Sequence, residues 1–478
     1  MDLQNRLSTG VPGLDTILKG GLVRNDTHLI YGPPGTGKTV LCHQICFNLI
    51  RTRQMRCVYL NLLTESPHEI ISHLEPFSFY DKGAVPESLY YLMAEGQIKK
   101  SGIISLVNLI GDTIQHRKAD MFIFEGIENA LFQSPEKIDF IEFVSQLRAL
   151  TRINSCTTIL TIKQSEPNPA LTVVDSIVEL NDLSKGPRSF KQITVHKTRG
   201  SAFLSGMHAV DLTGDGLQVY PRLETLPVPV EKMERKERRR MAMGIPELDS
   251  LMDGGIFTGS NLAVLGMPGT GKTTLGLSFL IEGARKGQRG VYMGFLETPE
   301  QLLRKTDNLD MPLRNYVENG TIQLLWQPPQ GLILDAAAQK LLQALESQGE
   351  GEKRVFIDGI ESFDMAMLYE ERFPLFFSAL LDHLNCCNAT LVVSKVIPLF
   401  SDLVNAKTEF VEQLSESVIL LRYLRSSEHV CKFLSVVKMR ESWYRSDTKS
   451  FHIGKGGFSI CELEEETRDV MRRLRIQY

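Results

Sequence analysis

The stretch GMPGTGKT at residues 266–273 repeats a pattern that occurs first as GPPGTGKT at residues 32–39. In the pattern G-x-x-x-x-G-K-[ST], glycines let the backbone curl so that several N–H groups face phosphate oxygens, and the lysine neutralises phosphate charge. The hydroxyl after the lysine is suited to hold Mg²⁺. Two copies predict two nucleotide-binding loops. The predicted nucleotide-binding residues are Gly32, Gly35, Thr36, Gly37, Lys38, Thr39 and Val40 in one loop, and Gly266, Gly269, Thr270, Gly271, Lys272, Thr273 and Thr274 in the other.

Each loop stands between a predicted strand and a predicted helix, which is the context that such a loop needs. The short apolar runs THLIY (27–31) and NLAVL (261–265) precede the loops. Segments of helical length and apolar spacing, VLCHQICFNLI (40–50) and TLGLSFLIEGARKG (274–287), follow them. These contexts favour phosphate binding over a glycine-rich turn with an incidental lysine.

The two loops belong to a long internal repeat. Lys38 and Lys272 are 234 residues apart, and the same spacing relates TGVPGLD (9–15) to MGIPELD (243–249). So long a period indicates a duplicated domain and not a solenoid. We therefore predict a first domain at 1–225, a basic linker at 226–242 and a second domain at 243–478.

Composition and charge narrow the class of protein. The 478 residues are 42% hydrophobic and 23% charged, without a run of membrane-span length or the apolar core of a signal peptide, so we expect a soluble, cytoplasmic protein with no membrane partner. Eight cysteines without paired C-x-x-C spacing indicate reduced thiols. A net charge of −4 makes a nucleic-acid partner unlikely. The basic run KMERKERRRM (232–241) could contact nucleic acid or another subunit, but a solvated linker is favoured.

Strands alternate with helical segments in both halves of the chain. The first strand candidates after the loops are CVYLNLL (57–63) and GVYMGFL (290–296), and the last reach HKTRG and VKMRE. Such alternation predicts two α/β domains with mostly parallel, doubly wound sheets. Ligands of these sheets bind beyond the carboxyl ends of the strands.

Each repeat has carboxylates at the ends of two predicted strands. Asp358 in RVFIDGIESF and Glu125 in MFIFEGIENALF terminate apolar strands, where an acid can hold Mg²⁺ directly or through water. Glu65 in LLTESPHEII and Glu297 in FLETPEQLLRK precede Ser/Thr-Pro, and a carboxylate there could polarise an attacking water as the catalytic group. The alternatives are a solvated strand-end acid and a helix-capping glutamate. The predicted metal ligands are Thr39, Glu125, Thr273 and Asp358.

Taken in order, these motifs resemble the RecA-like ATPases of the circadian-clock KaiC family. The shared features are the TG-[VI]-P-x-LD opening, a GG-[LI] turn, the phosphate loop, the carboxylate-[ST]-P segment and a terminal K-x-R, and they occur twice over about residues 7–465. The resemblance implies tandem RecA-like P-loop NTPase domains, a hexamer of two stacked rings, and ATP between neighbouring subunits. It also implies that a lysine and an arginine contact the γ-phosphate in the adjacent subunit. The matching residues are Lys197, Arg199, Lys438 and Arg440.

Two of the chain's departures from the KaiC pattern concern its chemistry. The first of two adjacent glutamates is replaced by Thr64 in one repeat and by Leu296 in the other, so hydrolysis could be slow. Glu412 and Gln413 stand where the clock protein has its Ser-Thr phosphoacceptor pair, and neither side chain can accept a phosphoryl group. Autophosphorylation at the usual family positions is therefore not expected.

These features predict an ATP-binding, Mg²⁺-dependent, ring-forming ATPase whose nucleotide state is read by a protein signalling partner. The alternative is a RecA- or DnaB-type recombinase or motor with nucleic-acid-dependent ATPase activity. A third alternative is a scaffold that binds ATP only to assemble. Two sites per chain would let one ring clamp nucleotide while the other ring turns it over.

Overall fold

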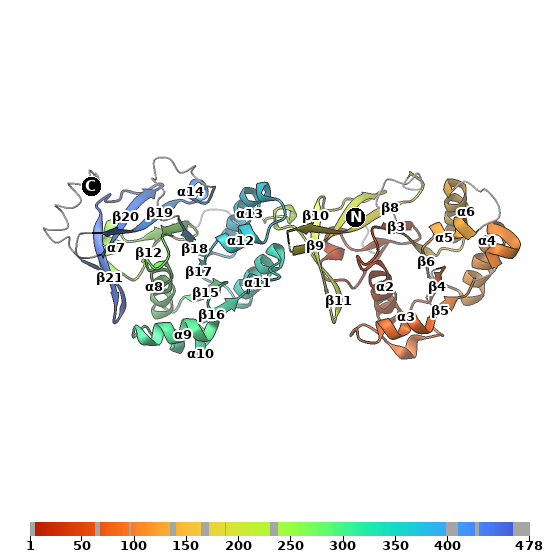
Figure 1. Cartoon of the computed structure of the whole chain (residues 1–478), viewed down its shortest axis with the longest axis horizontal. Coiled ribbons are helices and arrows are strands. Elements are labelled where there is room, and N and C mark those ends of the chain that lie inside the picture. Colours follow the sequence, from red (N-terminus) through yellow and green to blue (C-terminus); the bar gives the residue numbers. More distant parts are fainter. Residues whose placement is uncertain are drawn as a thin grey trace. The chain divides into compact units, whose positions relative to one another are not determined.

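A computed structural model describes residues 5–62, 67–94, 97–133, 140–163, 172–186, 188–229, 238–397, 410–425 and 430–461. The chain forms two compact units, residues 1–226 and 227–478 (Figure 1). Each unit is built on a sheet of nine strands with helices packed against it. The predicted α/β fold with tandem, mostly parallel sheets is confirmed.

The first unit contains the following elements, in two groups. Its strands are β1 (Arg6–Leu7), β2 (Leu22–Val23), β3 (Thr27–Tyr31), β4 (Cys57–Asn61), β5 (Leu89–Leu92), β6 (Met121–Glu125), β7 (Thr157–Ile162), β8 (Ser176–Lys185), β9 (Arg188–Thr198), β10 (Met207–Thr213) and β11 (Gly216–Tyr220). Its helices are α1 (Leu14–Ile17), α2 (Lys38–Arg53), α3 (Pro67–Leu74), α4 (Gln97–Arg117), α5 (Glu128–Gln133) and α6 (Phe140–Ile153).

The second unit repeats this plan. Its strands are β12 (Arg240–Met241), β13 (Ile256–Phe257), β14 (Asn261–Gly266), β15 (Arg289–Gly294), β16 (Ile322–Trp326), β17 (Lys353–Asp358), β18 (Ala389–Val396), β19 (Ser417–Arg425), β20 (Val430–Met439), β21 (Lys449–Gly454) and β22 (Gly457–Cys461). Its helices are α7 (Pro246–Leu251), α8 (Lys272–Arg285), α9 (Pro299–Asn308), α10 (Leu313–Glu318), α11 (Leu334–Ser347), α12 (Glu361–Met365), α13 (Phe373–Cys386) and α14 (Phe410–Leu414).

Both sheets have the same strand order. In the first sheet β8, β3, β7, β6, β4 and β5 are parallel neighbours in that order, and β9, β10 and β11 continue from β8 as antiparallel strands. In the second sheet the parallel order is β19, β14, β18, β17, β15 and β16, and β20, β21 and β22 are antiparallel. The strand that leads into each phosphate loop, β3 or β14, therefore lies inside the parallel part.

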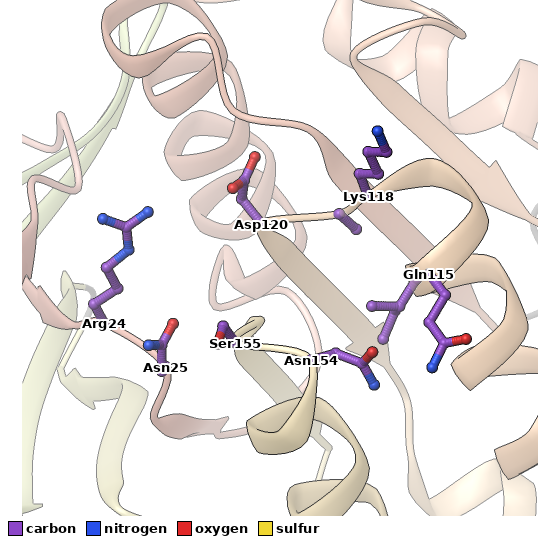
Figure 2. A pocket seen from close by; sticks show the side chains of 9 residues that line it. Arg24, Asn25, Gln115, Lys118, Asp120, Asn154 and Ser155 are labelled. Atoms are coloured by element: carbon purple, nitrogen blue, oxygen red, sulfur yellow. The ribbon is translucent and has the colours of Figure 1, made fainter.

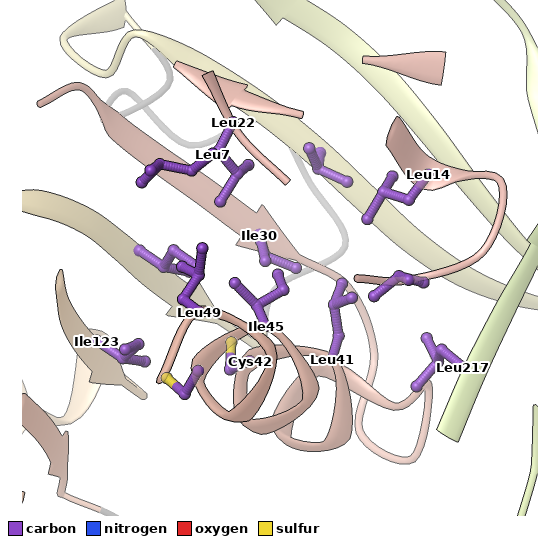
Figure 3. Packing of buried hydrophobic residues seen from close by; sticks show 14 of the residues in the cluster. Leu7, Leu14, Leu22, Ile30, Leu41, Cys42, Ile45, Leu49, Ile123 and Leu217 are labelled. Carbon is purple, nitrogen blue, oxygen red and sulfur yellow. The ribbon is translucent and has the colours of Figure 1, made fainter. Parts of the chain in front are cut away.

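Alternate residues of the central strands face two separate cores, because side chains of a strand point to opposite faces of the sheet. On one face Ile30 and Ile123 pack against α2 (Figure 3). Tyr59 belongs to the same core. On the other face Leu29 and Val58 pack with residues of α4 and α6. Burial on both faces explains why the strands read as continuous apolar runs, and it makes the first sheet doubly wound.

The end of the predicted linker belongs to the second unit. Strand β12 pairs antiparallel with β13, as β1 pairs with β2 in the first unit. The basic side chains form ion pairs there, because Arg238 lies 3.1 Å from Glu416 and Arg240 lies 3.0 Å from Asp253. Residues 230–237 of the predicted linker lie outside the described part of the chain.

Candidate functional site

The first phosphate loop connects β3 to α2 and depends on glycine for its shape. Gly35 and Gly37 have φ angles of 80° and 100°, in the left-handed region that side chains disfavour. A Cβ atom on Gly32 would stand 1.8 Å from the carbonyl oxygen of Leu180 on β8. In the second loop Gly269 and Gly271 have φ angles of 77° and 98°. Both loops therefore have the curled backbone that exposes N–H groups to an anion.

Side chains within each loop hold it closed. Lys38 donates hydrogen bonds to the carbonyl oxygens of Gly32 and Pro33 at 2.7 and 2.8 Å. Lys272 makes the equivalent bonds to Gly266 and Met267 at 2.8 and 3.0 Å. Burial lowers the pKa of both lysines, and neighbouring carboxylates act in the opposite direction.

The remaining loop residues lie around these lysines. The hydroxyls of Thr36 and Thr270 donate to the carbonyl oxygens three residues earlier, at 2.9 and 2.8 Å, and so brace the loops. Val40 and Thr274 lie in the first turns of α2 and α8, where Val40 packs against the core and the Thr274 side chain is buried. Their backbone N–H groups lie at the helix N-termini, where phosphates are commonly bound.

The candidate metal ligands of the first unit meet at the carboxyl end of β6. The Thr39 hydroxyl donates a short hydrogen bond to Glu125 Oε1. The Tyr59 hydroxyl donates to Glu125 Oε2 at 2.6 Å. Glu125 is 3% exposed, so its longer side chain reaches the threonine from inside the protein.

The second unit brings the corresponding residues together at the end of β17. The Thr273 hydroxyl donates to Asp358 Oδ2 at 2.8 Å, and the Tyr292 hydroxyl lies 3.3 Å from the same oxygen. The Ser394 hydroxyl donates to Asp358 Oδ1 at 2.6 Å. Asp358 thus accepts a hydrogen bond from β18 as well.

A hydroxyl beside a carboxylate fits Mg²⁺, which takes hard oxygen ligands and often binds through one carboxylate plus substrate phosphates. In the described ranges no group of three or more His, Cys, Asp or Glu residues could enclose a metal by itself. Each pair would therefore hold the ion together with phosphate oxygens and water. The Mg²⁺ site and the phosphate site would be one site.

The structure describes only one of the two predicted catalytic glutamates. Glu65 lies outside the described residues. Glu297 follows β15, is half-exposed, and accepts hydrogen bonds at both carboxylate oxygens from Lys305 Nζ, at 3.0 and 3.3 Å. The Thr298 hydroxyl caps α9 by accepting a hydrogen bond from the N–H of Gln301, so this helix has a cap other than Glu297.

The K-x-R residues contact backbone carbonyls of their own unit. Lys197 Nζ donates to the carbonyl oxygen of Val174 at 2.8 Å, and Arg199 donates to that of Thr172 at 2.9 Å. In the second unit Lys438 donates to the carbonyl oxygens of Glu412 and Ser415 at 3.0 and 2.7 Å, and Arg440 donates to that of Gln413 at 2.9 Å. Both pairs reach from the end of the first antiparallel strand, or the residue directly after it, to the segment before the last parallel strand.

Sequence reasoning missed the tyrosine and serine hydroxyls that donate to the strand-end acids, and it missed the lysine that binds Glu297. Tyr59 and Tyr292 occupy matching positions in β4 and β15, so comparison of the two repeats could have found them. Ser394 and Lys305 carried no signal, because only the fold brings them to their carboxylates.

A separate pocket of about 560 Å³ lies at the opposite edge of the first sheet (Figure 2). It is formed where β3, β6 and β7 begin, so it is not part of the phosphate site at their carboxyl ends. Its polar lining residues are Arg24, Asn25, Gln115, Lys118, Asp120, Asn154 and Ser155.

The repeated geometry agrees with comparisons to known proteins. The family model for the KaiC ATPase matches residues 7–224 and again residues 241–465. The chain belongs to the KaiC ATPase family. The circadian clock oscillator protein KaiC of Picosynechococcus sp. is 24% identical over 476 residues, which cover 95% of this chain and 89% of that protein. The KaiC 1 protein of Synechocystis sp. is 23% identical over 476 residues with the same coverage. KaiC of Synechococcus elongatus is 23% identical over 472 residues, covering 95% and 89%.

Membership in the KaiC family confirms the resemblance inferred from the motifs. The family consists of ATPases of the RecA superfamily, so ATP is the implied nucleotide of the two loops. No helix in the described part of the chain combines the length and the apolar character that a membrane crossing requires.

Proposed function

We propose that this KaiC-family protein binds Mg-ATP in both units, hydrolyses it, and assembles into a ring whose nucleotide state a protein partner reads. The observation that carries the proposal is the repeated contact between the hydroxyl of each loop and a strand-end acid, Thr39 with Glu125 and Thr273 with Asp358. All eight cysteines are free thiols, which agrees with a reducing, cytoplasmic setting.

In this proposal each group has a role that its chemistry supports. The loop N–H groups and Lys38 or Lys272 bind the phosphates, while Thr39 and Glu125, or Thr273 and Asp358, hold Mg²⁺. Bound Mg²⁺ neutralises charge that develops on the phosphates. Glu65 and Glu297 polarise the attacking water, and in the second unit this requires Lys305 to release the carboxylate of Glu297.

A ring completes the sites with residues from a neighbouring subunit. Lys197 and Arg199, or Lys438 and Arg440, would contact the γ-phosphate held by that neighbour. The contacts of these side chains with their own backbone support a coupling between the phosphate and the segments at Thr172 and Gln413. We propose a hexamer, as in the resemblance stated above.

The second unit lacks an acceptor for autophosphorylation at the usual family positions. Glu412 supplies a permanent charge, which lies 3.3 Å from the ammonium group of Lys395. The nearby Ser415 is fully buried, and its hydroxyl donates to the carbonyl oxygen of Val411 at 2.6 Å. We propose that this ion pair replaces a reversible phosphate.

Incubation of the full chain with Mg-ATP tests the proposal. We expect a hexameric mass, steady ADP production, and no phosphopeptide between residues 408 and 417. Lys38→Ala and Lys272→Ala should each reduce the bound ATP from two to about one per chain, since each loop binds one nucleotide. A monomeric mass in saturating Mg-ATP, or no ADP, would contradict the proposal. ADP production that requires added DNA would favour the recombinase or motor alternative.

Glu297→Gln in a Lys38→Ala chain tests the catalytic glutamate of the second unit. The amide keeps the shape but cannot take a proton, so hydrolysis should fall on the order of a hundredfold while ATP binding persists. Glu65→Gln in a Lys272→Ala chain is the same test for the first unit. Unchanged ADP production in both would remove these glutamates from the reaction.

A further inference from the structure

A second carboxylate stands three residues after each strand-end acid. Glu128 opens α5 after β6, and Glu361 opens α12 after β17. The two stretches, FEGIEN and IDGIES, match in the repeat, and neither glutamate is among the predicted phosphate, metal or catalytic residues. Their recurrence in both units makes an accidental placement a poor explanation.

Both carboxylates bind to the end of the next strand in the sheet. Glu128 Oε1 accepts a hydrogen bond from the N–H of Lys163, directly after β7, at 3.2 Å. Glu361 Oε1 accepts a short hydrogen bond from the N–H of Val396, the last residue of β18. Strands β7 and β18 lie directly beside β3 and β14, which lead into the phosphate loops. The carboxylates therefore lie at the sheet edge over which the terminal phosphate of ATP must sit.

The second oxygen of Glu128 is an acceptor that needs a partner. Glu128 Oε2 is buried and accepts no hydrogen bond from any residue that the structure describes. A buried acceptor left without a donor costs free energy, so a water or ligand hydrogen normally satisfies it. In the second unit, the charges of Glu361 and Asp358 raise the pKa of Lys272 against the effect of burial, and the effect of Glu361 is the larger. The charge of Glu361 therefore acts on the ammonium group that binds phosphate.

A second carboxylate follows the neighbouring strand at the same end of the sheet. Gly294 of β15 is the register partner of Asp358 of β17 in parallel pairing. Glu297 and Glu361 each follow three residues beyond these partners, at the same edge of the sheet. A water molecule has two hydrogens, so two carboxylates can fix both its place and its orientation.

We propose that Glu361 in the second unit and Glu128 in the first accept a hydrogen bond from the water that attacks ATP. This inference rests on the proposed hydrolysis. The water oxygen bonds to the γ-phosphorus, and the bond from that phosphorus to the β–γ bridging oxygen breaks with its electron pair leaving on ADP. One water proton passes to Glu297 or Glu65 and then to the phosphate released. Glu361 or Glu128 holds the other hydrogen and does not change its protonation state.

Glu361→Gln in the Lys38→Ala chain tests the assignment, because only the second site then contributes ADP. The amide can still accept the Val396 N–H through its oxygen but presents an NH₂ group to the water. We expect kcat to fall tenfold to a hundredfold, on the order of the cost of a misplaced reactant. The Kd of a non-hydrolysable ATP analogue with Mg²⁺ should stay within about threefold. Glu346→Gln, which alters an exposed glutamate of α11, is the matched control and should leave both values unchanged.

Two further variants keep the result interpretable. Glu361→Asp retains a carboxylate one methylene shorter and should recover part of the lost kcat, whereas a merely structural role predicts no recovery over the amide. Glu128→Gln in the Lys272→Ala chain should repeat the effect at the first site. A kcat within twofold of the control, or an equal loss of analogue binding and kcat, would overturn the inference. An unmutated chain that produces no ADP would instead overturn the proposed function.

Discussion

Tyr59 and Tyr292 place a phenol hydroxyl against each strand-end carboxylate. Both rings are buried, and burial raises the pKa of both phenols, with Glu125 or Asp358 acting in the same direction. The hydroxyls therefore stay protonated and remain hydrogen-bond donors at physiological pH. The donor is closer in the first unit, at 2.6 Å from Glu125 compared with 3.3 Å from Asp358.

Tyr59→Phe should destabilise the first unit more than Tyr292→Phe destabilises the second. Removing a hydrogen bond to a buried charged group costs about 1.5–3 kcal/mol, and the Asp358 oxygen keeps Thr273 as a donor in the Tyr292 variant. Urea denaturation followed separately for each unit, through local fluorescence probes, measures the two free energies of unfolding. If both variants lost the same free energy of unfolding, the shorter distance in the first unit would not strengthen the hydrogen bond.

Strand β3 has a buried histidine where β14 has a leucine. His28 is 1% exposed, its Nε2 lies 3.0 Å from the carbonyl oxygen of Val23, and burial lowers its pKa to about 4. The aligned residue of β14 is the buried Leu262. Because the folded pKa lies below the ordinary value of 6.5, the unfolded chain takes up the proton first as the pH falls. The stability contributed by neutral His28 is complete above pH 6.5 and is lost as the pH falls towards 4.

His28→Leu should make the first unit less sensitive to acid. At pH 7.5 the substitution removes one hydrogen bond, which costs about 1 kcal/mol. Between pH 7.5 and pH 5 the variant should gain about 2 kcal/mol relative to the unmutated chain, because it lacks the imidazole at position 28 that the unfolded state protonates. Urea denaturation of the first unit at the two pH values measures this difference. If the two proteins differed by the same free energy of unfolding at both pH values, the lowered pKa of His28 in the folded state would be contradicted.

For the whole molecule, the question is whether each ATP site is complete within one subunit or is shared between two subunits through the K-x-R pairs. Two variants can separate these cases. A chain with Arg440→Ala can hold ATP in its second loop but cannot contribute the arginine. A chain with Lys272→Ala contributes the arginine but cannot hold ATP. Removing an arginine that acts in trans typically lowers hydrolysis by a thousandfold or more.

Mixing the two variants before assembly should restore hydrolysis, because some interfaces combine an intact loop with an intact arginine. Both chains also carry Lys38→Ala, so that the first sites bind no ATP. ADP production in the mixture is then compared with the mean of the two separate proteins. Mixing the same chains after ring assembly is the control and should give no gain. Production equal to the mean under both conditions would mean that Arg440 acts within its own subunit or not at all.

The sequence by itself determined the features that depend on local pattern. A phosphate loop is a contiguous run whose glycines are required by backbone sterics, so GPPGTGKT and GMPGTGKT identified it without the fold. Parallel strands buried on both faces are apolar runs, and the predicted strands at 27–31 and 261–265 correspond to β3 and to all but the last residue of β14. The repeat and the KaiC family followed from the same runs.

Only the tertiary structure decided which distant groups meet at the strand ends. Tyr59, Ser394 and Lys305 reach their carboxylates across neighbouring strands or the start of a helix, and such contacts leave no periodic trace in the sequence. The antiparallel strands β10, β11, β21 and β22 were not predicted, because their half-exposed residues alternate without a continuous apolar run. The placement of Glu128 and Glu361 beside the phosphate loops likewise depends on sheet order, which brings β6 and β17 within one strand of the loop strands.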